Sequence, residues 1–324
     1  MNILIVKLSS LGDVVQTMPV VADILAVHPD AQIDWVVEEA FAPLVARVQG
    51  VRRVIPIALR RWKKTWFFRV TRAERKAFKA ALRQATYDAV IDCQGLIKSA
   101  MVARMANLTP QGLRGSFANK SEACSYEWPV RFLLSHNQAM PARIHAVART
   151  RLLAGQLLGY VIQGLPKTVF KNIPRCDPTS HTVMLTHGTT RLDNEWPKWK
   201  WENLSAWLVE HGAHRVLLPH SNSRELAVCD GVKRHIPNNA EILPRMGLPE
   251  LLDVMATCRG VIGVDSGLSH LAVALDLPHV QIFSQDRAWR AGPVDRLHQV
   301  AVGGTYTPSV EDVRRAWLKV EAAR

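Results

Sequence analysis

The amino-acid sequence predicts an α/β protein of two domains, each a doubly wound parallel sheet with helices on both faces. Its 324 residues are about twice the length at which a second domain is expected. Short apolar runs alternate with helical stretches in both halves, the pattern of doubly wound sheets. The Gly- and Pro-containing segment 164–178 favours neither helix nor strand. We therefore expect domains at residues 1–165 and 175–308.

In the first half, the apolar run Ile3–Val6 precedes a polar loop at 9–13 and a helical pattern from Val14 to Val27. Further strands are predicted at 33–37, 54–57 and 88–92. Strands of the second half are predicted at 183–185, 216–218, 242–243, 261–264 and 280–283, with helices at 202–211 and 249–258. A last helix within 309–324 has one apolar face, which leaves open that it packs back onto the first domain.

The site is predicted from the topology of such sheets. Ligands of open parallel sheets bind beyond the C-terminal strand ends, so two facing domains predict a cleft between them. No apolar stretch reaches the ~18 residues that cross a bilayer, and the first residues lack a signal sequence, so we expect a cytoplasmic protein. The 5 cysteines are scattered and without a C-x-x-C pair, which argues against disulfides and zinc.

Basic residues are concentrated in the first half. Residues 1–165 hold 22 Lys/Arg against 11 Asp/Glu, and between Arg60 and Arg83 there are 10 basic residues and one acid, Glu74. Such a surface attracts phosphates, anionic lipid or nucleic acid. The aromatic run at 66–68 within it could rest at a membrane interface. A solvated helix face is the commoner explanation of a charge run, although mixed signs would serve solubility better.

The loop Ser9-Ser10-Leu11-Gly12-Asp13 follows the first strand. Gly12 permits a sharp turn, and Asp13 then stands at the C-terminal edge of the sheet. A carboxylate there could accept a proton from an attacking hydroxyl. Alternatively, Asp13 caps a helix that starts at Val14, and spacing alone favours the cap.

Two polar loops of the second half could bind an anion. Asp265-Ser266-Gly267-Leu268-Ser269-His270 directly follows a strand, and the backbone N–H groups of a first helical turn suit a diphosphate. His187-Gly188-Thr189-Thr190-Arg191 follows another strand with two hydroxyls and a cation. Helix capping and a plain polar turn are the alternatives. No G-x-G-x-x-G fingerprint supports a nicotinamide site.

These motifs, in this order and with Trp196-Pro197 after the Thr pair, resemble the heptosyltransferases of bacterial lipopolysaccharide synthesis, glycosyltransferase family 9. Trp35–Glu39, Arg60–Trp62 and Ile91–Ser99 look most like the members that act first on the core. The resemblance covers nearly the whole chain. It implies a GT-B fold and an inverting transfer of heptose from ADP-heptose to a Kdo residue of Kdo2-lipid A.

The resemblance also assigns roles. Asp13 matches the general base. The donor-binding residues it implies are Ser10, Gly12, Thr189, Thr190, Arg191, Asn194, Glu225, Met246, Asp265, Ser266, Gly267, Leu268 and His270. The basic first half would bind the acceptor through Arg60, Arg61, Lys64 and Lys98. Asn194 departs from the family, whose close members carry a Lys there, and Arg191 is the candidate for the missing charge.

No obligatory metal or other cofactor is implied, nor any nucleic-acid partner, and the acceptor would tether the enzyme to the cytoplasmic face of the inner membrane. Three alternatives stay open. A sister heptosyltransferase would act on a later core acceptor. A non-catalytic nucleic-acid binder would explain the charge. A nicotinamide oxidoreductase would share the topology but lacks the fingerprint loop.

Overall fold

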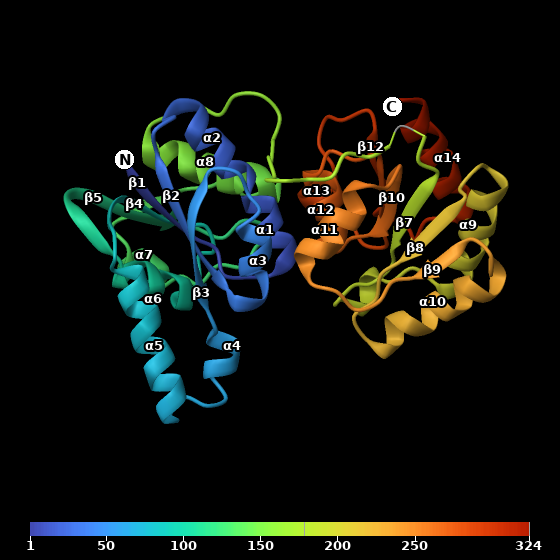
Figure 1. Cartoon of the computed structure of the whole chain (residues 1–324). Coiled ribbons are helices and arrows are strands. Elements are labelled where there is room, and N and C mark those ends of the chain that lie inside the picture. The colour runs from blue at the N-terminus through green and yellow to red at the C-terminus, as the bar shows by residue number, and fades with distance from the viewer. Residues whose placement is uncertain (178, 324) are drawn as a thin grey trace. The chain divides into compact units, whose positions relative to one another are not determined.

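The structure is a computed structural model that describes residues 1–177 and 179–323. Residues 178 and 324, which end the predicted linker and the predicted last helix, lie outside these ranges. The chain divides into two compact units, Met1–Lys171 and Asn172–Arg324. Each contains its own six-stranded sheet with helices on both faces (Figure 1). The predicted α/β fold class is confirmed.

The sheet of the first unit has the order β3-β2-β1-β4-β5-β6, and all neighbouring strands are parallel. The strands are β1 Asn2–Val6, β2 Gln32–Glu38, β3 Val51–Ile57, β4 Thr86–Asp92, β5 Asn107–Phe117 and β6 His136–Gln138. Strand order reverses between β1 and β4, so the loops after these two strands flank the crevice in which such sheets bind ligands. The sequence predicted β1 to β4 and missed β5 and β6.

Helices cover both faces of this sheet. On one face, α1 (Leu11–Thr17), α2 (Pro19–Val27) and α8 (Ala146–Leu158) pack together. On the other face, a core that includes Trp62, Phe78, Val102 and Val130 lies under α4 (Leu59–Trp62), α5 (Arg69–Leu82), α6 (Ile97–Met105) and α7 (Val130–Leu133). The short helices η1 (Glu39–Phe41) and α3 (Ala42–Val45) join β2 to β3.

The helix predicted from Val14 to Val27 is two helices, and it begins three residues earlier, at Leu11. Pro19 is the first residue of α2 and has no N–H to donate to the preceding turn, so the chain divides there. The earlier start matters for the site because it places Asp13 inside the first turn of α1.

The second unit repeats the plan, with the all-parallel order β12-β11-β10-β7-β8-β9. Its strands are β7 Thr182–Thr186, β8 Arg215–Leu218, β9 Ala240–Ile242, β10 Gly260–Val264, β11 His279–Phe283 and β12 Gln299–Gly303. Its helices are η2 Leu192–Asn194, α9 Lys198–Glu210, α10 Ser223–His235, α11 Leu248–Ala256, α12 Gly267–Ala274, α13 Ala288–Ala291 and α14 Val310–Ala322. Strand order reverses between β10 and β7. The sequence missed β12.

The last helix, α14, belongs to the second unit. Its buried residues Val313, Trp317 and Val320 join the core formed by α9, α10 and the sheet. Gly260 at the start of β10 lies directly under the Trp317 indole, with no room for a Cβ atom. The apolar face of α14 is therefore filled within its own unit.

The division of the chain also divides its charge. Residues 1–171 contain 24 Lys/Arg and 11 Asp/Glu, whereas residues 172–324 contain 17 of each. The whole net charge of +13 thus lies in the first unit.

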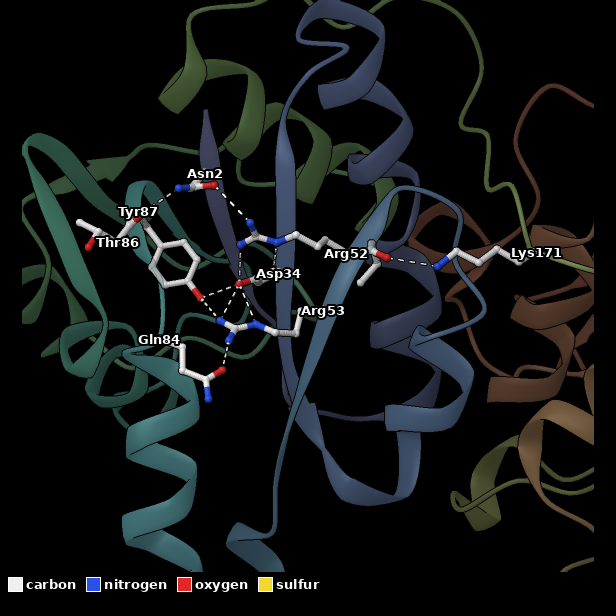
Figure 2. A network of polar contacts seen from close by, with 9 residues as sticks. Asn2, Asp34, Arg52, Arg53, Gln84, Thr86, Tyr87 and Lys171 are labelled. Carbon is white, nitrogen blue, oxygen red and sulfur yellow. Dashed lines mark hydrogen bonds and ion pairs between the residues drawn. The ribbon is translucent and has the colours of Figure 1, made fainter.

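An ion network around the buried Asp34 stabilises the first sheet at some distance from its C-terminal edge (Figure 2). The Asp34 carboxylate on β2 accepts hydrogen bonds from Arg52 Nε at 2.9 Å, Arg53 Nη2 at 2.8 Å and the Tyr87 hydroxyl at 2.8 Å. Burial alone would raise the pKa of Asp34, but these hydrogen bonds together hold it below its ordinary value. The network ties β2 to β3 and β4, and it leaves the strand ends free for other side chains.

Candidate functional site

The loop after β1 places Asp13 in a capping box. Ser10 is the N-cap of α1, and Asp13 Oδ2 accepts hydrogen bonds from Ser10 N at 3.1 Å and from Ser10 Oγ at 2.7 Å. Asp13 is half-buried. The expectation that Asp13 itself occupies the N-cap is wrong by three positions. Its carboxylate supports the first turn from within and still reaches the C-terminal edge of the sheet, while Gly12 lies between the two partners.

The neighbouring loop after β4 holds this loop in place. Gln94 Oε1 accepts a hydrogen bond from Leu8 N at 2.8 Å. Gln94 is in turn fixed by the fully buried Asp92, which accepts from Gln94 N at 3.0 Å and from Ser99 Oγ at 3.1 Å. Burial raises the pKa of Asp92 to about 6 despite these hydrogen bonds. The loops after β1 and β4, where the strand order of the first sheet reverses, are therefore connected by hydrogen bonds.

The predicted acceptor residues differ in their surroundings. Arg60 and Lys98 are exposed and act electrostatically on one buried carboxylate, Glu38 at the end of β2. Burial raises the pKa of Glu38, and the Arg60 backbone N–H and both cations oppose that rise. The structure thus brings Arg60 and Lys98, from α4 and α6, to one place.

Arg61 is engaged elsewhere. Its guanidinium forms ion pairs with Glu39 at 3.0 Å and with Glu74 at 2.8 Å. These bonds join α4 to α5 and to η1, which directly follows β2, so Arg61 fixes the position of α4. Lys64, just after α4, is exposed to solvent.

In the second unit, Asp265 is the centre of a polar cluster after β10. Asn194 donates to Asp265 Oδ2 at 3.2 Å, and His270 Nε2 lies 3.4 Å from Asp265 Oδ1. Burial would raise the pKa of Asp265, but the His270 hydrogen bond and the nearby positive charges lower it. Asn194 is buried and committed to Asp265, so it organises the loop and brings no charge.

The first turn of α12 follows β10, where the sequence predicted a helix start. Ser266 is its N-cap, with Ser266 Oγ 3.4 Å from Ser269 N, and Gly267 and Leu268 form the half-buried turn. Ser269 Oγ donates to Val264 O at 2.6 Å and holds the helix start against β10. The N–H groups of a helix start point outward with a partial positive charge, which suits phosphate oxygens.

The loop after β7 lies next to this helix start. Thr189 is buried and its hydroxyl approaches Asp265 O at 3.4 Å, whereas Thr190 and Arg191 are exposed. Arg191 forms a close bidentate ion pair with Asp193, so its charge is already partly balanced. Thr189 therefore positions the loop, and Thr190 and Arg191 are the side chains available to a ligand.

Glu225 and Met246 follow the next two strands, β8 and β9, along the same edge. Glu225 on α10 accepts from Ser221 Oγ at 2.9 Å and from Asn222 Nδ2 at 2.9 Å, and its carboxylate packs against Gly188, where a Cβ would displace it. Met246 is half-buried in the loop between β9 and α11. The structure thus connects Glu225 to the loop after β7, while Met246 lies beyond β8 at the same edge.

Sequence reasoning missed Arg287. It follows β11 at the N-cap of α13, and the preceding loop touches η2 through Ser284 Oγ and Glu195 O at 3.4 Å and through Gln285 Nε2 and Asp193 O at 3.4 Å. Burial and two neighbouring arginine charges lower the pKa of Arg287. Among the described residues it forms no ion pair. Its position four residues past a strand end was the available signal.

Among residues 1–177 and 179–323 no three His, Cys, Asp or Glu side chains are grouped so that they could hold a metal ion. None of the helices in the described part of the chain is long and apolar enough to cross a bilayer.

Comparisons with known proteins agree with this geometry. The family model for glycosyltransferase family 9 (heptosyltransferase) matches residues 75–317. Lipopolysaccharide heptosyltransferase 1 of Escherichia coli K12 is 38% identical over 87% of this chain and 88% of that protein. The protein of that name from Pseudomonas aeruginosa is 35% identical over 99% and 92%. The solved structure of E. coli heptosyltransferase WaaC with ADP-2-deoxy-2-fluoro heptose has a TM-score of 0.81 and 34% identity, covering 97% of this chain and 98% of that one.

Two parallel-sheet units with polar residues gathered at their strand ends, together with these matches, define a glycosyltransferase of the GT-B architecture. The chain belongs to glycosyltransferase family 9, the heptosyltransferases. The family expected from the sequence is confirmed. Sugar transfer is therefore its chemistry, in place of the nucleic-acid binding and the nicotinamide chemistry that the sequence had left open.

Proposed function

We propose that this chain transfers heptose from ADP-heptose to a Kdo residue of Kdo2-lipid A, with inversion at the anomeric carbon. The donor is supported by the WaaC structures, which contain ADP-2-deoxy-2-fluoro heptose or ADP. The acceptor is supported by the relatives' name and by a basic first unit that suits sugar carboxylates and lipid phosphates. The observation that carries the proposal is the Asp13 carboxylate in the first turn of α1, which accepts hydrogen bonds from Ser10 in a chain of this family.

Asp13 is the proposed general base. A hydroxyl of the Kdo acceptor attacks the anomeric carbon of heptose and forms the new C–O bond, while Asp13 takes the hydroxyl proton. The bond from the anomeric carbon to the β-phosphate oxygen breaks, and ADP leaves with the electron pair. One in-line displacement inverts the anomeric centre, so one carboxylate suffices. This step requires Asp13 and the donor to meet, and the cleft between the domains stays a prediction.

The leaving diphosphate is the proposed ligand of the second unit. Its negative charge would be stabilised by the N–H groups of α12, by Thr190 and by cations. Arg191 shares its charge with Asp193, whereas Arg287, which lies near the same loops, has no ion pair within residues 1–177 and 179–323. We therefore assign to Arg287, assisted by Arg191, the role that the family resemblance implies for a Lys at position 194.

Arg60, Lys64 and Lys98 are the proposed acceptor contacts, and Arg61 acts as a positioning residue through Glu39 and Glu74. Because lipid A is anchored in a bilayer, the enzyme would work on the cytoplasmic face of the inner membrane as a peripheral protein. No nucleic acid takes part.

The test replaces Asp13 in two ways. Asp13→Asn keeps an acceptor for Ser10 N and removes the base, whereas Asp13→Ala removes both. We expect kcat on Kdo2-lipid A to fall about 10²- to 10⁴-fold in both variants with ADP affinity unchanged. Only Asp13→Ala should also lose about 1 kcal/mol of unfolding free energy, because it breaks the capping box.

The chain supplies a matched control. Asp312 occupies the same position in the capping box of α14, where it accepts from Ser309 N at 2.9 Å and from Ser309 Oγ at 2.7 Å. Asp312→Asn should leave kcat unchanged. Near-normal turnover by Asp13→Asn would reduce Asp13 to a helix-capping residue. Turnover only on an already heptosylated core would assign the chain to the later step instead.

A further inference from the structure

The segment from α4 to α5 forms a helical hairpin that extends away from the rest of the first unit (Figure 1). Its base is fixed. Arg61 joins Glu39 and Glu74, and the buried Trp62 packs edge-on against Phe78 with ring centroids 5.9 Å apart. These contacts hold the two helices of the hairpin together at its base.

The tip of the hairpin, residues 63–70, exposes a cluster of apolar side chains. Phe67 is 77% exposed, Phe68 65% and Val70 68%, and Trp66 is 42% exposed beneath the Arg75 guanidinium. A hydrogen bond of 2.8 Å between Thr65 and Thr71 hydroxyls closes the loop that presents them. Soluble proteins rarely leave contiguous large apolar groups in water, so this tip is expected to have an apolar partner.

The charges around the tip indicate which partner. Basic residues flank the aromatic run on both sides: Lys63, Lys64, Arg69, Arg72, Arg75 and Lys76. The single acid of the hairpin, Glu74, is already bonded to Arg61 and Trp62. Aromatic side chains surrounded by cations match the surface of an anionic bilayer. The aromatic rings would contact the acyl chains, and the cations would contact the lipid phosphates.

A second apolar cluster lies at the same edge of the sheet. Ile97 and Met101 on α6 and Trp128 and Phe132 at α7 are exposed, and the Arg131 guanidinium lies over the Phe132 ring. Hydrogen bonds from Glu127 N to Gly95 O and from Ile97 N to the Glu127 carboxylate fix this cluster to the end of β4. The hairpin follows the end of β3, so both clusters belong to the C-terminal strand edge that also carries Arg60, Lys98 and Asp13.

We propose that the hairpin tip is a lipid-inserting anchor, with Trp66, Phe67 and Phe68 in the interfacial layer of an anionic membrane and the flanking cations on its phosphates. The inference rests on the proposed function in one respect, that the acceptor is a membrane lipid. It adds which element touches the bilayer and which face of the first unit is turned toward it.

The test measures binding of the full chain to vesicles of phosphatidylcholine alone or mixed with phosphatidylglycerol. The variant replaces Trp66, Phe67 and Phe68 by Ala. The control replaces Trp199, Leu297 and Tyr306, which are 56%, 84% and 54% exposed in the second unit, by Ala. We expect the wild type and the control to sediment with anionic vesicles and the tip variant to lose at least about tenfold in partitioning.

Turnover separates this inference from the proposed function. With a deacylated, water-soluble Kdo acceptor the tip variant should match the wild type, which also shows that it is folded. With the acceptor embedded in anionic vesicles it should be at least about tenfold slower. Unchanged vesicle binding by the tip variant would overturn the anchor and leave the proposed function intact. Equal binding of the wild type to neutral and anionic vesicles would overturn the role of the cations. A wild type that binds vesicles but transfers to neither acceptor would overturn the proposed function alone.

Discussion

Asp92 should make the first unit more stable as the pH falls toward 5. The carboxyl is fully buried at the end of β4, and burial raises its pKa to about 6 from an ordinary 3.8. A group whose pKa is raised by folding contributes stability that is complete below the unfolded pKa and is lost as the pH rises through the folded pKa. The relevant window is therefore between about pH 4 and pH 7. Asp92→Asn removes this titration and preserves the side-chain shape.

The size of the effect follows from the two pKa values. A difference of about two units corresponds to about 3 kcal/mol between the fully protonated and the fully ionised protein. Between pH 7.5 and pH 5 the protein gains only part of this stabilisation, because pH 5 lies only about one pH unit below the folded pKa. The unfolding free energy of the wild type should rise by about 1.4 kcal/mol relative to Asp92→Asn over that interval, a factor of about ten in the opening equilibrium.

Hydrogen exchange read by mass spectrometry suits this comparison. At each pH, a peptide from β4 has nearly the same intrinsic exchange rates in both proteins, so the ratio of measured rates reports the difference in opening free energy. The ratio, variant over wild type, should rise about tenfold between pH 7.5 and pH 5. Peptides from β10 in the second unit serve as the internal control. If the ratio of exchange rates in the β4 peptide stays constant between pH 7.5 and pH 5, Asp92 does not titrate in this range with a raised pKa, and the reasoning is refuted.

Two further predictions concern the second unit. Gly263→Ala should lower the unfolding free energy by at least about 2 kcal/mol in urea titrations, because the new Cβ would overlap Thr186 Oγ1 and Ser269 Oγ at the start of α12; an unchanged midpoint would show that the sheet can yield there. Arg287→Ala should weaken ADP binding about tenfold or more in calorimetry, since a charged hydrogen bond contributes about 1.5–3 kcal/mol. Arg191→Ala, whose cation already pairs with Asp193, should have the smaller effect, and the reverse order would return the leading role to Arg191.

The central strands of both sheets were predictable because they are buried on both faces and therefore read as apolar runs. β5 contains Pro110, Gly112 and Gly115 and is largely half-exposed, and β6 is the short polar segment His136–Gln138. Both become strands through pairing with a neighbour that is already in place, as Gly115 does opposite His136. Both strands therefore depend on tertiary contacts more than on local preference.

The positions of the candidate site residues along the chain were predictable, but their contacts were not. Polar loops after apolar strands located Asp13, Thr189 and Asp265 at the sheet edges without any contact being known. The partners of those side chains were not predictable, because they come from distant segments. Arg61 looked like an acceptor contact until its ion pairs with Glu39 and Glu74 showed a structural task, and nothing local in the sequence joins those three residues.

The unequal division of charge gives the molecule a built-in electrical polarity. One unit carries all of the net +13 and the other is neutral, so the field of an anionic surface pulls on the first unit alone. Because the pull acts on one unit only, it exerts a torque on the molecule. At physiological salt this torque acts within a Debye length of about 8 Å of the surface, and it turns the basic unit toward the surface before any side chain makes contact. The second unit, whose formal net charge is zero, experiences no such net pull.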